Sequence, residues 1–372
     1  MRMLAVDVGT GTQDILLFDS EREPENHLKL VMPSPTLLVA ERIRRVTAER
    51  RPLLLTGVIM GGGPSAWAAE AHRRAGLPVY ATPDAARSFN DDLERVRQDM
   101  GIEIVSDDEA ASLRDAARVE LRDFDLDAIR GAFAAFGVSL EIDGLAVGVF
   151  DHGNAPPNVS DRLFRLNYLA DRLAVDDRLS TFAFPAHRIP SIMTRLRAVA
   201  DTAQRQTDLP LVVMDTAPAA VLGALEDPRV QAEPDAVIVN VGNFHTLAFR
   251  FHDGHIAALF EHHTGLLNQA TLEGWLRELA TGTINHERVF ADMGHGALVR
   301  DEHPGDLHFL AVIGPRRAML RDSRLPVYFA VPHGDQMLAG CFGMIRACAD
   351  VVPEWGEVIR AGLSGTGGKG LW

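Results

Sequence analysis

Short apolar runs alternate with amphipathic stretches along the chain, which is typical of an α/β protein. The apolar runs predict β-strands at 4–6, 15–18, 53–59, 78–80, 145–150, 211–214, 236–239, 246–251, 255–260, 309–313 and 326–331. Helical spacing predicts α-helices at 36–50, 65–75, 217–225 and 335–350, and a charged, helical region at about 84–137. An Asp253-Gly254 pair between two alternating strands predicts a tight hairpin.

The length of 372 residues is too great for one ordinary hydrophobic core, so two domains are expected. Residues 226–234 contain two prolines and a cluster of charges, and the strand pattern restarts after them. We therefore expect an N-terminal domain at 1–225, with a helical insertion around 84–137, and a C-terminal domain at 235–372.

A Gly/Thr loop, Asp7-Val8-Gly9-Thr10-Gly11-Thr12, joins the first two predicted strands. A dinucleotide-binding fingerprint would need Gly or Ala at position 14, where the chain has Asp, and a helix after it. A P-loop needs Gly-Lys-Ser/Thr, but Lys369, one of only two lysines, is followed by Gly370. The loop is either a phosphate-binding turn, with Asp7 holding a hydrated Mg²⁺, or an ordinary glycine-rich turn.

A second copy of this pattern, Asn240-Val241-Gly242-Asn243-Phe244-His245-Thr246, opens the second half. With this repeat the chain resembles the ASKHA superfamily of actin, heat-shock chaperone ATPases and sugar kinases, and also the activator ATPases of the benzoyl-CoA-reductase type. The resemblance implies two ribonuclease H-like domains with a nucleotide cleft between them, and ATP and Mg²⁺ as cofactors. The implied cofactor-binding residues are Asp7 (also on the metal), Gly9, Thr10, Gly11, Thr12, Asn240, Gly242, Asn243, His245, Thr246 and Gly314.

A closer resemblance is to an uncharacterised prokaryotic family labelled pyruvate-formate-lyase-activating-enzyme-like. It is carried by residues 7–14, 60–64, 151–153 and 332–335. A true activase of that name would be a radical enzyme with a three-cysteine cluster. The sequence has only Cys341 and Cys348, seven apart on a predicted helix, so we expect two buried thiols and not that activity.

Two aspartates that end predicted strands are the candidate catalytic groups. Asp215 is placed to act as a general base or to position water, or to cap the helix that follows it. Asp151 is the alternative base, or part of a surface turn.

Ten of the fourteen histidines lie between 245 and 333, but no helical His-x-x-x-His pair occurs, so a metal site is not expected. His245 could donate a hydrogen bond to a phosphate.

The net charge of −14 argues against binding to nucleic acid or to an anionic membrane. No apolar run is long enough to span a membrane, and we expect a cytoplasmic protein whose partner is a small-molecule nucleotide, with a homodimer allowed.

The predicted function is ATP binding of the ASKHA type, as an ATPase or a small-molecule kinase. The alternative is a non-catalytic nucleotide or metabolite sensor or scaffold, which Asn240 and Pro315 favour because they replace the Asp and Gly of the family pattern. A histidine-site metalloenzyme is a third alternative.

Overall fold

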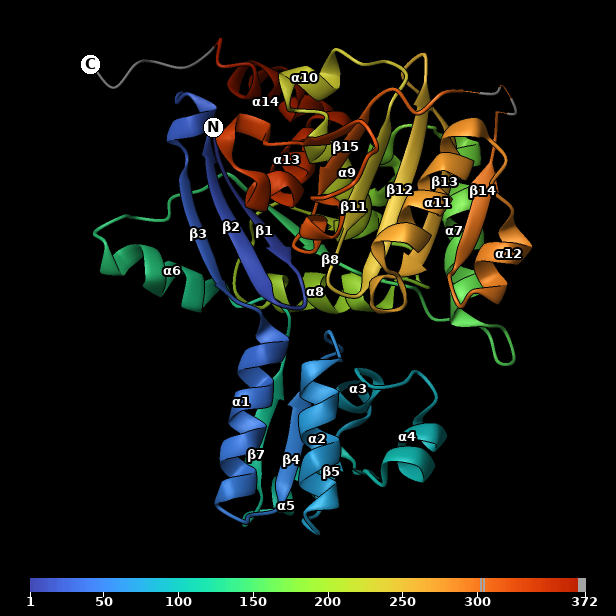
Figure 1. The fold of residues 1–372 in the computed structure, drawn as a ribbon. Coiled ribbons are helices and arrows are strands. Elements are labelled where there is room, and N and C mark those ends of the chain that lie inside the picture. Colours follow the sequence, from blue (N-terminus) through green and yellow to red (C-terminus); the bar gives the residue numbers. More distant parts are fainter. Residues whose placement is uncertain (302, 304, 367–372) are drawn as a thin grey trace.

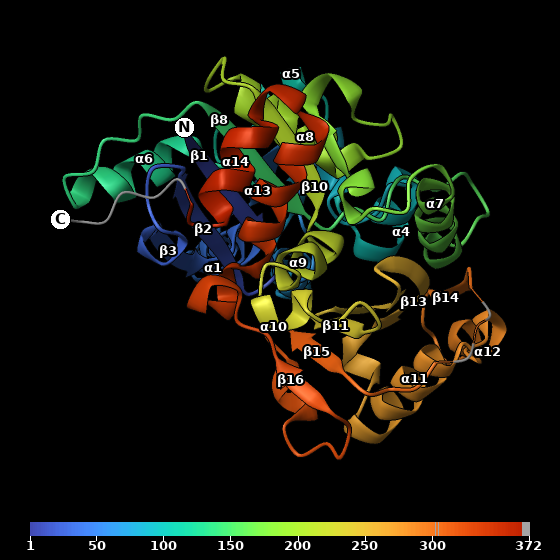
Figure 2. The same cartoon turned by 90° about the horizontal axis from the view of Figure 1, so that it is seen from above.

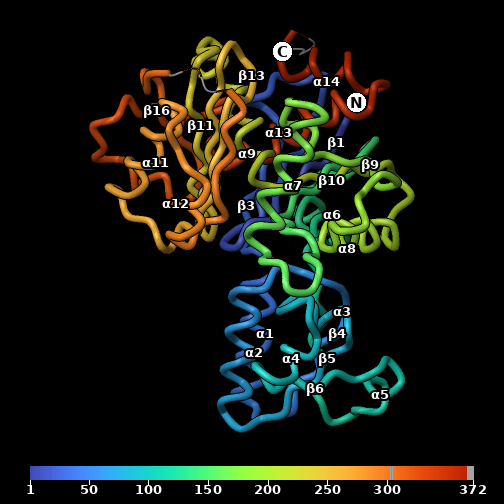
Figure 3. The backbone as a smooth tube through the Cα atoms, turned by 90° about the vertical axis from the view of Figure 1, so that its right-hand side faces the viewer, coloured from blue at the N-terminus to red at the C-terminus, as the bar shows by residue number. Residues whose placement is uncertain are grey.

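Two six-stranded sheets and one four-stranded sheet organise the chain (Figure 1). The structure is a computed structural model that describes residues 1–301, 303 and 305–366. Lys369, which bears on the P-loop question, lies outside the described residues. The first and second sheets form the body of the molecule, and the small sheet projects from it, as Figures 1 and 3 show.

The first sheet has the strand order β3-β2-β1-β8-β10-β9. Its strands are β1 (Arg2–Val8), β2 (Thr12–Asp19), β3 (Leu28–Pro33), β8 (Gly144–Val149), β9 (Ala183–Pro185) and β10 (Leu211–Asp215). β1 pairs antiparallel with β2 and parallel with β8, and β8 pairs parallel with β10. The strands β1, β8 and β10 are buried on both faces, which explains their nearly continuous apolar sequences.

The second sheet has the order β14-β13-β12-β11-β15-β16. Its strands are β11 (Val237–Val241), β12 (His245–His252), β13 (His255–His263), β14 (Gly296–Val299), β15 (Leu310–Ile313) and β16 (Val327–Phe329). The turn between β12 and β13 places Asp253 at φ 47° and Gly254 at φ 77°. Two positive φ angles are what a type I′ hairpin turn needs, so the predicted Asp-Gly hairpin is confirmed.

The two large sheets share the topology of five strands. In each, an antiparallel hairpin leads to a third strand on one side, and two later strands add in parallel on the other side. The sixth strands differ, because β9 pairs with β10 and β14 pairs with β13 at the opposite edge. The shared five-strand order is the ribonuclease H-like arrangement, so the predicted fold class, two such units in an α/β protein, is confirmed. The division into domains at 226–234 stays a prediction.

Helices α9 (Thr216–Ala224) and α13 (Ala339–Val351) cross between the two large sheets (Figure 2). Their backbones are in direct contact, because an added Cβ atom on Gly223 would lie 1.7 Å from the Ala339 carbonyl oxygen. Cys341 and Cys348 are buried, unpaired thiols in α13, as expected. The other helices around the large sheets are α6 (Leu126–Ala135), α7 (Asp161–Val175), α8 (Thr194–Gln204), α10 (Pro228–Gln231), α11 (Gln269–Thr281), α12 (His286–Ala291) and α14 (Gly356–Leu363).

The small sheet, ordered β6-β5-β4-β7, forms a separate module with its own core. Its strands are β4 (Leu53–Gly57), β5 (Val79–Ala81), β6 (Glu103–Ile104) and β7 (Ala117–Leu121). Its helices are α1 (Pro35–Ala48), α2 (Pro64–Arg74), α3 (Pro83–Arg87), α4 (Leu93–Met100) and α5 (Asp107–Ser112). The region 84–137, expected to be helical, thus also contains two strands. In β7 buried residues alternate with the exposed Arg118 and Glu120, a period-two pattern that its charged residues conceal.

Candidate functional site

A cleft of about 520 Å³ opens where the two large sheets meet the small module. Its volume is in the range of small-molecule binding sites. The two Gly-containing loops, β1–β2 and β11–β12, both line it, and a Cβ atom added to Gly11 would lie 3.0 Å from the Asn243 side-chain nitrogen. The loops that the sequence identified as a repeat therefore face one another.

Most of the predicted site residues line this cleft: Asp7, Gly9, Thr10, Thr12, Asp151, Asn240, Gly242, Asn243, His245 and Gly314. Gly11 lies in the first loop beside Asn243. Thr246 and Asp215 are buried behind the cleft wall, and the Thr246 hydroxyl is hydrogen-bonded to that of Thr264 at 2.9 Å. What these residues bind stays a prediction.

Two carboxyl groups lie side by side at the β1–β2 end of the cleft. Asp7 and Asp14 are opposite one another in the antiparallel register, so both side chains leave the same face of the hairpin. Burial raises the pKa of Asp7 to about 6, and burial together with the charge of Asp7 raises that of Asp14 to about 8. Asp7 accepts a hydrogen bond from the Thr216 hydroxyl at 2.5 Å, whereas Oδ1 of Asp14 is buried with no partner among the described residues. A divalent cation would compensate both charges.

Close approach at this end requires glycine. A Cβ atom added to Gly340, near the start of α13, would lie 1.9 Å from Oδ2 of Asp7. Gly148 of β8 is the neighbour on the other side, where an added Cβ would be 3.3 Å from Oδ1. Any side chain at position 340 would displace the carboxylate, so the strand and the helix together fix its position.

Both candidate catalytic aspartates are engaged by other groups. Asp215 caps α9 by accepting from the Ala217 amide at 3.1 Å, and it forms a buried ion pair with Arg165. Asp151 accepts from the Gly153 and Leu196 amides, both at 2.9 Å. These contacts fit the capping alternative for Asp215. Asp151 is only 2% exposed, so the alternative of a surface turn is wrong for this residue. A role as base stays a prediction for both.

Arg165, in the middle of α7, is a central residue that the sequence analysis did not identify. Its guanidinium is fully buried, and it also pairs with Glu261 of β13 at 3.1 Å. It therefore joins the first sheet, through Asp215, to the second sheet, through Glu261. Its cation also lies 4.7 Å from the centre of the Phe150 ring. An arginine among many on an amphipathic helix gives no sequence signal of this role.

The small module contributes the Gly61-Gly62-Gly63 loop before α2. The Gly61 amide donates to Asp123 at 3.2 Å, and the Asp123 carboxylate pairs with Arg195 at 2.7 Å. Across the cleft, the Trp67 ring of α2 meets the Phe244 ring of the second loop edge-on, at 5.8 Å between centroids. On the first loop, the Ser34 hydroxyl at the start of α1 donates to the Thr10 carbonyl oxygen at 2.6 Å. The module therefore contacts both phosphate-loop candidates and covers one side of the cleft.

Comparison with known proteins assigns the chain to a family. Residues 60–319, more than half of the chain, match the family described as "Putative pyruvate format-lyase activating enzyme (DUF1786)". The chain belongs to this family, and the resemblance drawn from residues 7–14, 60–64, 151–153 and 332–335 is confirmed. A search of curated proteins finds no match. No helix among the described residues has the length and apolar character to cross a membrane.

Several solved structures are similar to the chain. The activator of 2-hydroxyisocaproyl-CoA dehydratase from Clostridium difficile, with bound ADPNP, is 8% identical over 100% of both chains, with a TM-score of 0.33. ROK hexokinase from Thermus thermophilus is 12% identical over 94% of this chain and 100% of its own, with a TM-score of 0.30. A ROK family transcriptional regulator, a homolog of E. coli MLC protein, is 10% identical with a TM-score of 0.28, and the alignment covers 68% of this chain and 37% of the regulator. The strand order of the two large sheets, and not these similarities, is the basis for the ASKHA-type fold.

Proposed function

We propose that the protein binds Mg²⁺–ATP in the cleft between its two large sheets, as an ASKHA-type ATPase or small-molecule phosphotransferase. The observation that carries this proposal is the placement of the two Gly-containing hairpin loops on one cleft. The Gly9 and Gly242 amides close their own turns by donating to the Thr12 and His245 carbonyl oxygens. The backbone amides of Thr10, Gly11 and Asn243 and the hydroxyls of Thr10 and Thr12 would hold the phosphates. Three arginines line the cleft, but Arg87 and Arg195 are already paired with Asp84 and Asp123. A metal ion would therefore carry part of the charge compensation.

Asp7, with Asp14 beside it, would hold the hydrated Mg²⁺. The raised pKa values indicate that the two buried carboxyls do not both ionise easily, and a divalent cation would remove that cost. Gly314 lines the cleft and would lie against the adenosine. Its φ of 98° and an added Cβ only 2.4 Å from the Val241 carbonyl oxygen show that this position requires glycine. Here β15 ends directly beside β11.

Isothermal titration of the full chain with Mg²⁺–ATP tests the binding. Asp7→Asn, which keeps the shape of the side chain, is expected to weaken binding by about tenfold to a hundredfold, the equivalent of one charge-assisted contact. Asp19→Asn is the matched control, because this carboxylate is on the same hairpin but at the opposite end of β2. Absence of binding heat with folded wild-type protein would refute the proposal.

The second candidate function is a nucleotide sensor or scaffold without turnover. It is favoured by the contacts of Asp151 and Asp215, whose carboxylate oxygens are already hydrogen-bonded or ion-paired. Asn240 also provides an amide where the family pattern has a carboxylate. Phosphate release and phosphorylation of a metabolite panel, measured with the same protein, separate the two functions. An active enzyme shows one of these at a rate that Asp7→Asn reduces, whereas a sensor binds and shows neither.

A further inference from the structure

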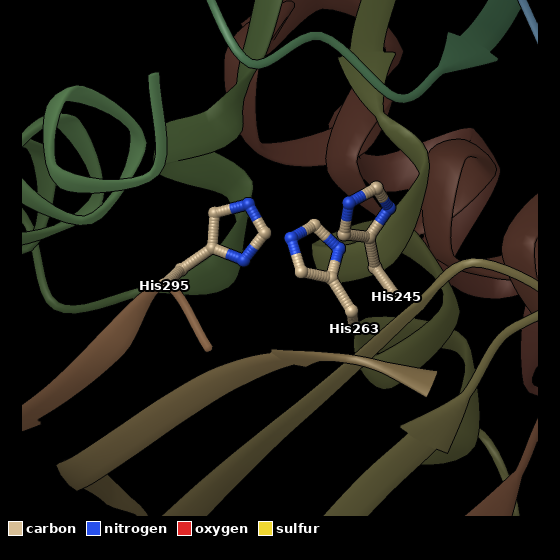
Figure 4. A group of neighbouring side chains, drawn as sticks. All are labelled: His245, His263 and His295. Carbon is tan, nitrogen blue, oxygen red and sulfur yellow. The ribbon is translucent and has the colours of Figure 1, made fainter. Parts of the chain in front are cut away.

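Three histidines come together on the cleft wall formed by the second sheet (Figure 4). His245 begins β12, His263 ends β13, and His295 directly precedes β14. His245 and His263 are opposite one another in the strand register, and the His295 amide donates to the Glu261 carbonyl at 2.9 Å. Three neighbouring strands therefore present one imidazole each at the same end of the sheet.

The rings form a nearly equilateral triangle. Their centroids are 5.1 Å apart for His245 and His263, 5.1 Å for His245 and His295, and 4.8 Å for His263 and His295. One nitrogen from each ring lies within 4.8 Å of the other two. In a tetrahedral site with metal–nitrogen bonds of about 2.1 Å, ligand nitrogens are about 3.4 Å apart. Rotation of the His263 and His295 side chains toward His245 would bring the nitrogens to this spacing.

The ring nitrogens of this cluster are available to a ligand. The described residues provide them with no hydrogen-bond partner, and Nδ1 of His295, a residue only 3% exposed, is a buried polar atom without one. By contrast, the more exposed His252, His255 and His303 each hydrogen-bond an aspartate through Nδ1. An unsatisfied buried nitrogen is costly, and a bound metal ion would provide the His295 Nδ1 with a partner.

The cluster is kept neutral, as metal ligation requires. Burial lowers the pKa of His295 to about 2 and that of His245 well below its ordinary value, and it lowers the pKa of His263 as well. The nearby cations do not block a metal, since Arg165 is paired with Asp215 and Glu261, and Arg162 donates to the carbonyl oxygens of Phe290 and Gly294.

The orientation of one ring is already fixed. His245 stacks on Phe150 at 4.1 Å between centroids with an interplanar angle of 3°. Strand alternation decides which histidine of β13 faces the cleft. His262 is buried on the opposite face of β13, where its Nε2 lies 3.3 Å from Asp292. Alternation thus leaves His263 to face the cleft.

We propose that His245, His263 and His295 bind one divalent transition-metal ion, with zinc as the best match to three neutral imidazoles. The fourth coordination position opens into the cleft, so it can take water or an oxygen atom of a carboxylate- or phosphate-bearing substrate. This site is separate from the Mg²⁺ expected at Asp7, because hard, oxygen-preferring Mg²⁺ and imidazole-preferring Zn²⁺ select different donors.

Metal loading of the full chain, purified without a polyhistidine tag and stripped with a chelator, tests the proposal. Co²⁺ is the spectroscopic probe for Zn²⁺: we expect about one ion per chain with the visible absorption bands of a four-coordinate site, and displacement of Co²⁺ by Zn²⁺. His263→Gln and His295→Gln are expected to weaken binding at least about tenfold, as loss of a ligand does. The control is His252→Gln with His303→Gln, a stacked pair 5.8 Å apart outside the cleft, which should leave binding unchanged.

The outcomes are distinct. Wild-type protein that takes up no stoichiometric Co²⁺ or Zn²⁺, or cluster variants that bind as wild type does, would overturn the proposal, and so would loss of binding in the control pair. Circular dichroism identifies any variant that fails to fold. If the His295→Gln variant fails to fold, the His263→Gln variant provides the test, because position 263 is only half-buried. Titration with Mg²⁺–ATP is read separately, and His263→Gln should retain it, so failure of the metal proposal is distinguishable from failure of the nucleotide proposal.

Discussion

Arg165 provides the sharpest test of how the cleft is held together. It reaches from α7 to Asp215 at the end of β10 and to Glu261 in β13, and it donates to the Asp151 carbonyl oxygen at 3.1 Å. Arg165→Met keeps most of the length and apolar volume of the side chain and removes the cation. Two buried carboxylates then lose their partner while remaining out of reach of water.

The expected cost follows from that burial. Removing one member of a buried ion pair typically costs about 3–5 kcal/mol, because the remaining charge stays desolvated and unpaired. Burial already raises the pKa of Asp215 to about 6, and Arg165 is the group that opposes this rise. A carboxyl with a raised folded-state pKa favours folding below its unfolded pKa of 3.8, and that contribution is lost as the pH rises through the folded value. The Met variant is therefore expected to lose least stability near pH 5 and most near pH 8.

Urea unfolding followed by tryptophan fluorescence, at both pH values, measures the effect. Adding Asp215→Asn and Glu261→Gln to Arg165→Met should recover most of the stability lost at pH 8, because no buried charge then remains unpaired. The control is Arg178→Met, which breaks an exposed pair with Asp176 and should cost about 0–1 kcal/mol. A cost below about 1 kcal/mol for Arg165→Met, or one that does not change with pH, would refute the reasoning.

Two further predictions concern the helix crossing and the acidic pair. Gly343→Ala places a Cβ atom 1.8 Å from the Ala219 carbonyl oxygen, so thermal unfolding should show a loss of about 3 kcal/mol or more, whereas Gly274→Ala, in open space on α11, should be neutral or stabilising. Equal melting temperatures for the two variants would contradict this packing. The raised pKa of Asp14, to about 8, predicts that Mg²⁺–ATP affinity increases as the pH rises from 6 to 9. Calorimetry should find a smaller increase in Asp14→Asn, and an identical pH profile would argue against a role for this carboxyl.

The parts of the site that depend on local sequence could be predicted. The Gly9–Thr12 loop and the Asp253-Gly254 turn are short segments whose conformation depends on the residues within them, and both lie where the pattern indicated. The repeat of the loop pattern at Gly242 gave the relation between the two halves. Strand β7 was not predicted, because alternate arginine and glutamate side chains reduce its apolar signal.

The groups that control charge in the cleft could not be predicted. Arg165 and Glu261 are 96 residues apart, and neither belongs to a motif. The histidine cluster could not be predicted from a helical ligand pair, because the three rings come from adjacent strands. Neighbouring strands bring residues together at the end of a sheet whatever their spacing in the sequence. A search for histidines at predicted strand ends, on strands expected to pair, would have found His245 and His263.

The Arg165 contacts also limit how the cleft can move. Rotation of the second sheet away from the first would separate Arg165 from Glu261, which are both fully buried. Each charge would then be either exposed to solvent or buried without a partner. The α9–α13 crossing, where backbones touch at Gly223 and Gly343, leaves no room for sliding. The small module is held to the first sheet's side of the cleft through Gly61, Asp123 and Arg195. Its contact with the second loop is the ring contact of Trp67 with Phe244, and Trp67 is 58% exposed. Movement that admits a ligand is therefore expected where the small module contacts the second loop, while the two loops and the histidine cluster keep their relative positions.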